Sequence, residues 1–170
     1  MRKTTSGLIA LLMLPSLAFA LPEAGDRAFT LSGSGTSNDD FDNNAISASI
    51  EFGYFNTPQL EYLVRQSLSF VEPEDGDSDW NGATRVGVDY HFGTGKMRPL
   101  IGATLGGVYG DKVDETFSAG LEIGMKYYAK EKTYITALVD YQFFFESSND
   151  IENNFDDGAV FYTLGIGYHF

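Results

Sequence analysis

The two histidines of the chain occur in matching sequences, Asp89-Tyr90-His91-Phe92 and Gly167-Tyr168-His169-Phe170. Imidazole is the commonest metal ligand and a frequent general base, so this pair is the first candidate for chemistry. A metal site needs a third ligand, and none is evident from the sequence. The shared aromatic-His-Phe ending is better interpreted as a strand-end pattern, so the sequence predicts no catalytic, cofactor-binding or metal-binding role for these histidines.

A second candidate is the acidic run Asp75-Gly76-Asp77-Ser78-Asp79-Trp80-Asn81-Gly82. Its later part matches the opening of an EF-hand calcium loop. The twelfth position of that pattern, where a bidentate Glu is needed, is Val88, so an EF-hand is excluded. Asp75, Asp77 and Asp79 remain weak candidates for cation binding, because a divalent ion would relieve the repulsion among acidic loops.

A third candidate is a group of eight ionisable residues. They occur in stretches where large apolar residues occupy every second position, and each of the eight lies on the opposite, less apolar side. Ionisable groups inside a membrane protein either mark a proton or ion pathway or pair to fill the interior. The ion-pair interpretation is favoured, since a small barrel leaves room only for side chains. The predicted lumen ion-pair network comprises Glu51, Glu61, Arg65, Arg85, Asp89, Glu122, Lys126 and Asp140.

Counting residues from the short turns of the chain divides this network into two layers. Charges cancel in the upper layer, which limits the cost of burying them. The upper layer comprises Arg65, Arg85, Glu122 and Asp140. The lower layer, nearer the turns, comprises Glu51, Glu61, Asp89 and Lys126.

The elements that must position these residues are eight segments with a period of two. The last segment shows it most clearly, because large apolar residues from Val160 to Phe170 alternate with Gly, Thr and His. Such alternation is typical of a strand between hydrocarbon and a crowded polar interior. The segments cover residues 27–37, 45–55, 59–70, 80–92, 98–109, 116–128, 133–145 and 158–170.

Aromatic residues gather near the segment ends, as in the girdles of a membrane barrel. A soluble barrel or sandwich with these aromatics in its core is the alternative. The opposite face argues against it, because Gly, Ala and Ser are common where a water-exposed strand would carry Lys, Glu and Thr. The prediction is therefore an all-β fold, an eight-stranded antiparallel up-and-down transmembrane β-barrel.

The N-terminus has the features of a cleaved signal peptide. Arg2 and Lys3 precede an apolar stretch that ends before the small-residue site Ala18-Phe19-Ala20, so residues 1–20 are predicted to be removed and residues 21–170 to form the barrel domain. The remainder has nine basic residues against 24 acidic ones, a net charge of −15, which makes nucleic acid an unsuitable partner. The chain has no cysteine, which excludes thiol chemistry.

The connections between segments alternate in length and charge. Those after the second, fourth and sixth segments are short, whereas those after the first, third, fifth and seventh are mostly longer and acidic. Short turns on the inner side and long loops on the outer side are typical of outer-membrane barrels. This asymmetry predicts that both termini are periplasmic and that the acidic loops are extracellular.

Three stretches carry a resemblance to a known group of proteins. They are Arg98-Pro99-Leu100-Ile101-Gly102-Ala103 with Gly106-Gly107, the run from Ala119 to Tyr127, and Gly165-Ile166-Gly167-Tyr168-His169-Phe170. With these stretches the chain resembles the small eight-stranded outer-membrane β-barrel proteins of Gram-negative bacteria, which include the OmpX-like barrels and the OmpA membrane domain. The resemblance implies that Tyr168 and Phe170 belong to the C-terminal signal read by the outer-membrane insertion machinery.

The resemblance is informative for fold and address and poor for activity, because such barrels host adhesins, anchors and lipid enzymes. A lipid A deacylase would need a Ser-His-acid triad on the lipid-facing wall near the outer leaflet, whereas both histidines are expected inside the barrel at the opposite end. The leading hypothesis is therefore a non-enzymatic envelope scaffold without cofactors, whose acidic loops bind divalent cations or cationic extracellular partners. A lipid-modifying enzyme and a narrow channel are the alternatives.

Overall fold

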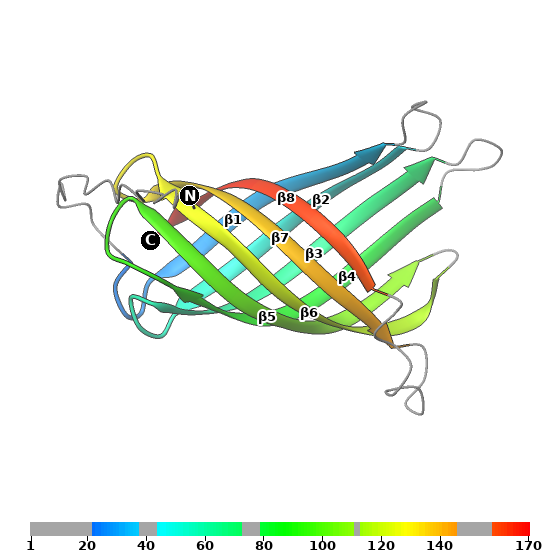
Figure 1. The fold of residues 1–170 in the computed structure, drawn as a ribbon, viewed down its shortest axis with the longest axis horizontal. Helices are drawn as coiled ribbons and strands as arrows, with labels where there is room; N and C mark the ends of the chain where they lie inside the picture. The colour runs from blue at the N-terminus through cyan, green and yellow to red at the C-terminus, as the bar shows by residue number, and fades with distance from the viewer. Residues whose placement is uncertain (1–21, 38–43, 73–78, 111–112, 146–157) are drawn as a thin grey trace, which may run out of the picture.

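Strict alternation of side chains along each segment produces a closed antiparallel barrel (Figure 1). The computed structural model describes residues 22–37, 44–72, 79–110, 113–145 and 158–170. The strands are β1 (Arg27–Ser37), β2 (Asn44–Phe55), β3 (Leu60–Glu72), β4 (Asp79–His91), β5 (Met97–Gly110), β6 (Val113–Tyr128), β7 (Thr133–Phe145) and β8 (Gly158–His169). The predicted fold class is confirmed, and most strand ends lie within two residues of the predicted ones.

Each strand pairs with its neighbours in sequence, and β8 returns to pair with β1. This last seam runs over six residue pairs, from Ala28↔His169 to Gly33↔Leu164. Beyond the end of β8, Phe170 exchanges two backbone hydrogen bonds with Arg27, at 2.8 and 2.9 Å. The C-terminal residue therefore completes the wall beside the start of β1.

The two ends of the barrel differ. The end that holds residues 56–59, 92–96 and 129–132, together with the start of β1 and the end of β8, is called the turn end, and the opposite end is called the loop end (Figure 1). The connection between β5 and β6 differs from the longer acidic loop that was predicted there, because both strands extend further than expected. After a register shift at Val108/Gly110 the two strands pair up to Gly110↔Val113, so Asp114 and Glu115 belong to β6.

The outward face forms an apolar belt. Large hydrophobic side chains on all eight strands are 36–69% exposed there, which confirms the predicted outward orientation of the apolar face. Trp80 and Tyr90 mark the two ends of this belt on β4. Ten residues span about 33 Å along a strand, and a tilt of about 40° reduces this to roughly 25 Å of height, the usual height of the apolar band of outer-membrane barrels.

Among the described residues, none lies in a helix that is long and apolar enough to cross a membrane. Residues 1–21, which contain the predicted signal peptide, lie outside the described part of the chain.

Glycines on the inward face make room for large side chains. Gly167 of β8 pairs with Tyr134 of β7, and a Cβ at position 167 would overlap the Tyr134 ring. We predict that Gly167→Ala lowers the free energy of unfolding by about 1–3 kcal/mol, because the ring must leave its rotamer or the strands must separate. The measurement is the urea midpoint of the barrel refolded in detergent.

The matched control for this variant is Gly107→Ala, since a Cβ at position 107 has no heavy atom within 4 Å. Equal midpoints for the two variants would contradict the role assigned to Gly167.

Candidate functional site

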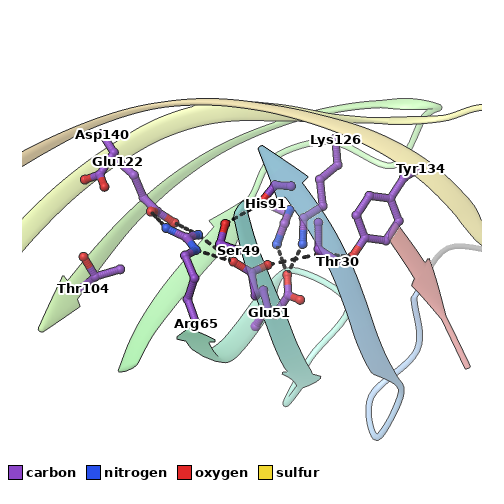
Figure 2. A network of polar contacts seen from close by, with 12 residues as sticks. Thr30, Ser49, Glu51, Arg65, His91, Thr104, Glu122, Lys126, Tyr134 and Asp140 are labelled. Atoms are coloured by element: carbon purple, nitrogen blue, oxygen red, sulfur yellow. Dashed lines mark hydrogen bonds and ion pairs between the residues drawn. The ribbon is translucent and has the colours of Figure 1, made fainter. Parts of the chain in front are cut away.

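The lumen is filled by side chains from every strand, and many of them are charged. Buried polar or charged residues outnumber buried apolar ones on the inward face, which is the reverse of a soluble core. All eight residues of the predicted network lie on this face, and seven are no more than 6% exposed, Arg85 being the exception. Ion pairs and hydrogen bonds connect most of them across the barrel (Figure 2).

Arg65 of β3 holds the centre of the network. Its guanidinium contacts Glu51 of β2, with an NH2 to Oε2 distance of 2.6 Å and an Nε to Oε2 distance of 2.8 Å. The same group reaches across the lumen to Glu122 of β6, donating from NH1 to Oε2 at 2.8 Å and from NH2 to Oε1 at 3.3 Å. The planar fork of arginine suits this double contact, and it ties three strands together through the interior (Figure 2).

This pairing corrects the predicted layers. Glu51 was expected in the lower layer, apart from Arg65, but the β2–β3 hairpin pairs Phe55 with Glu61 and so places Glu51 directly opposite Arg65. The charge of Arg65 is therefore balanced by two carboxylates, on a neighbouring strand and on a distant one.

A second cluster surrounds Lys126 nearer the turn end. Its ammonium lies 2.6 Å from Oε2 of Glu61 and donates to it, and His91 Nε2 lies 2.8 Å from the same oxygen. The ammonium also lies 4.9 Å from the ring centre of Tyr134 and 5.8 Å from that of Phe55. Cation–π contacts and one carboxylate thus replace the water that an ammonium would otherwise bind.

Three residues of this region offer the ligand types of a metal site. Single ligand atoms of Glu61, Asp89 and His91 lie within 4.8 Å of one another, and all three residues are buried. The sequence did not reveal these partners for His91, because strand pairing brings them together. The ammonium of Lys126 already supplies positive charge at Glu61.

The remaining network residues lie nearer the loop end. Both carboxylate oxygens of Asp140 accept from Nε2 of Gln142, at 2.7 and 2.8 Å, and that nitrogen also donates to Thr104 at 3.1 Å. The guanidinium carbon of Arg85 lies 6.0 Å from the ring centre of Phe161. Asp140 thus forms its hydrogen bonds with a neutral amide, whereas Arg85 lies against an aromatic ring.

Arg98 is a lumen cation that sequence reasoning missed. It is 1% exposed, lies opposite Lys126 in the β5–β6 register, and donates from NH2 to the carbonyl oxygen of Pro58. Its position could have been found from the alternation of β5, where Arg98, Gly102 and Gly106 share the inward face.

The other predicted site residues are the three loop aspartates and the two aromatic residues of the C-terminal signal. Asp75 and Asp77 fall outside the described residues, and Asp79 is described only as the first residue of β4. Tyr168 and Phe170 lie on the outer face at the turn end, 46% and 54% exposed, with ring centres 6.4 Å apart.

Comparisons with known proteins agree on the fold. No protein-family profile and no curated protein matches this sequence. Among solved structures, the N-terminal β-barrel domain of Pseudomonas aeruginosa OprF matches with a TM-score of 0.60 and 20% identity, covering 87% of this chain and 98% of that one.

Two further solved structures are similar. The outer membrane protein OprG from Pseudomonas aeruginosa has a TM-score of 0.62 and 13% identity, covering 90% of this chain and 99% of that one. Neisserial surface protein A has a TM-score of 0.54 and 16% identity, covering 85% and 94%. These likenesses confirm the predicted resemblance to small outer-membrane barrels at the level of the fold.

The contacts of Arg65 give a stability prediction. Arg65→Met leaves Glu51 and Glu122 buried without their cation, so we expect the free energy of unfolding to fall by about 3–5 kcal/mol. Adding Glu51→Gln and Glu122→Gln to that variant removes the stranded charges and should restore most of the loss. Urea midpoints of the refolded barrels measure both effects.

Lys130→Met, in an exposed turn, is the control and should change stability by less than about 0.5 kcal/mol. A single Arg65→Met variant as stable as this control would show that the Arg65 pairs contribute nothing.

Proposed function

We propose that this protein is a non-enzymatic integral barrel of the bacterial outer membrane, with a lumen closed by ion pairs and acidic extracellular loops that act as an interaction surface. The apolar belt supports the membrane placement, because a face of large exposed hydrophobic side chains about 25 Å high is suited to lipid and costly in water. The similarity of the fold to outer-membrane barrels points the same way.

The double contact of Arg65 is the observation that carries the scaffold proposal. A guanidinium bound to Glu51 on one side and Glu122 on the other spans the interior, and the cage of Phe55 and Tyr134 around Lys126 lies between it and the turn end. Two consecutive layers of buried side chains favour a stiff wall over a conducting pore.

The positions of the histidines favour a non-enzymatic role. His91 and His169 are 0% and 1% exposed and lie inside the barrel near the turn end. An acyl chain of a membrane lipid lies against the outer face, so neither imidazole can reach its ester or amide bond.

The orientation follows from the same proposal. With the turn end in the periplasm, Tyr168 and Phe170 are presented where insertion machinery can bind them, and the acidic loops face the outside. Their expected partners there are divalent cations and cationic extracellular molecules, with membrane lipids around the wall.

Conductance tests the closed lumen. We predict no steady current through the wild-type barrel in planar bilayers, and none through Arg65→Ala, because the layer around Lys126 stays in place. Single-channel recording at several voltages is the measurement. A steady wild-type current that changes with Arg65→Ala would establish a channel and overturn the scaffold proposal.

Calcium binding tests the loop surface. The combined changes Asp75→Asn, Asp77→Asn and Asp79→Asn should weaken Ca²⁺ binding by about threefold or more from a wild-type Kd on the order of 1 mM, a typical affinity of weak extracellular sites. Isothermal titration of the refolded barrel measures this change. Glu131→Gln, in a short turn at the other end, is the matched control, and equal effects of the two variants would contradict the role of these aspartates.

A further inference from the structure

Three buried residues near the turn end of the lumen are arranged like the ligands of a metal ion. Glu61 of β3 and Asp89 of β4 are direct partners in the strand register, and His91 follows Asp89 two positions later on the same inward face. One potential ligand atom from each residue lies within 4.8 Å of the others, and the three residues are no more than 1% exposed. Glu61, Asp89 and His91 are called the inner cluster below.

Carboxylates outnumber cations in the inner cluster. Among the described residues, the ammonium of Lys126 is the only lysine or arginine group within 4.0 Å of either carboxylate, and it contacts Oε2 of Glu61 at 2.6 Å. No ion pair reaches Asp89 in the described wall. A buried carboxylate without a cation is costly, so the cluster favours the binding of additional positive charge.

Each member of the inner cluster also keeps one buried acceptor atom without a hydrogen bond. Within the described part of the chain these atoms are Oε1 of Glu61, Oδ1 of Asp89 and Nδ1 of His91. Nε2 of His91 lies 2.8 Å from Oε2 of Glu61, and a carboxylate only accepts, so in the neutral imidazole Nε2 carries the hydrogen and Nδ1 keeps a free lone pair. Buried acceptors without a donor cost free energy, which a bound cation would recover.

A divalent metal ion meets these requirements better than a water molecule. One water has two hydrogens for three acceptors and brings no charge, whereas a metal ion takes a lone pair from each ligand and neutralises the carboxylates. Imidazole and carboxylate both bind Zn²⁺, and three protein ligands with a water in the fourth position are a common set. Tetrahedral Zn²⁺ holds its ligands about 3.4 Å apart, so side-chain shifts of roughly 1 Å would bring the three residues to coordination distance.

The position of the inner cluster gives an ion a short path from the turn end. His91 is the last residue of β4, and Glu61 is the second residue of β3, directly after the connection 56–59. A strand rises about 3.3 Å per residue, so Asp89, two residues before His91, lies roughly 7 Å from the end of β4. The Arg65 contacts lie on the other side of the cluster, toward the loop end. An ion therefore enters from the turn end without crossing them.

We propose that Glu61, Asp89 and His91 form a binding site for a divalent transition-metal ion, with Zn²⁺ as the best-matched ion. Lys126 competes with the metal, because its ammonium and His91 reach the same oxygen of Glu61 (Figure 2). The site goes beyond the proposed loop surface: it lies at the opposite end of the barrel and uses a nitrogen ligand. It therefore selects against Ca²⁺, which takes six to eight oxygen ligands.

Zinc titration of the refolded barrel tests this site. The protein is prepared without an affinity tag, and excess Ca²⁺ is present to occupy the acidic loops. We expect isothermal titration to show saturable binding of one Zn²⁺ per barrel. Asp89→Asn and His91→Gln should each weaken this binding by about tenfold or more, since even the loss of an outer-shell partner of a metal costs about 10–100-fold.

Asp140→Asn and His169→Gln are the matched controls. Asp140 is another buried lumen carboxylate, whose oxygens accept from Gln142, and His169 is the other histidine of the chain, also buried. Both controls should keep the wild-type affinity for Zn²⁺. In metal-free buffer, Asp89→Asn should be at least as stable to urea as the wild type, because it removes a buried charge that has no partner.

Lys126→Gln provides a second test, which is read from stability. It leaves Glu61 buried without its cation, so the metal-free variant should unfold at a lower urea concentration than the wild type. Zn²⁺ should raise the urea midpoint of this variant more than that of the wild type, since the competing ammonium is gone. Adding Asp89→Asn should abolish this rescue. Refolding of Lys126→Gln only when Zn²⁺ is present would support the same conclusion.

Three results would overturn the inference: no saturable Zn²⁺ binding by the wild type, equal losses of affinity in the controls and the cluster variants, or no stabilisation of Lys126→Gln by Zn²⁺. The second result would identify adventitious binding elsewhere on the barrel. None of these results bears on the acidic loops, whose role is decided separately by the Ca²⁺ titration.

Discussion

Backbone hydrogen bonding governs this architecture. A peptide group left unpaired in hydrocarbon costs several kcal/mol, so a sheet that crosses a bilayer must close on itself. Pairing of β8 with β1, continued by the bonds between Arg27 and Phe170, provides that closure. Closure with eight strands also fixes the width of the lumen, which is just wide enough for side chains to fill it. The content of the lumen follows from this geometry.

The lumen shows how buried charge is made tolerable. Arg65 is balanced by two carboxylates, and Lys126 by one carboxylate and two aromatic rings. Glycines provide the necessary space, since the Glu61 side chain occupies the volume over Gly53, and Asp89 and Glu122 meet over Gly102. The same alternation of small and large residues therefore determines both the wall of the barrel and the side chains that fill its lumen.

Much of the fold could be predicted because the period-two signal is local. Each strand carries it on its own, and the final strand from Val160 shows it to its last residue. The lumen residues were also accessible, since parity alone assigns Arg65 and Glu122 to the inward face. The ends of β5 and β6 were harder to predict, because the polar residues Asp114 and Glu115 suggest a loop, whereas the strands pair again beyond them at Gly110↔Val113.

Specific partners in the lumen could not be predicted in the same way. The carboxylates that contact Arg65 are determined by the strand register and by contacts between β3 and β6. Arg65 and Glu122, which form one of these contacts, are 57 residues apart in the sequence. Counting residues from the short turns placed Glu51 in a different layer from Arg65, whereas the strand register pairs the two residues directly. The inward position of Arg98 follows from the alternation of β5, but its contact with Pro58 is tertiary and could not be predicted from the local pattern.

The seam between β1 and β8 has a consequence for dynamics. Its register covers six residue pairs, whereas the β2–β3 and β3–β4 registers each cover twelve. Cooperative opening of a sheet begins where the least pairing is lost, so this junction sets the lowest free energy of local unfolding in the described wall. In a ring of eight strands, opening at this line separates β1 from β8 and leaves the other ladders intact.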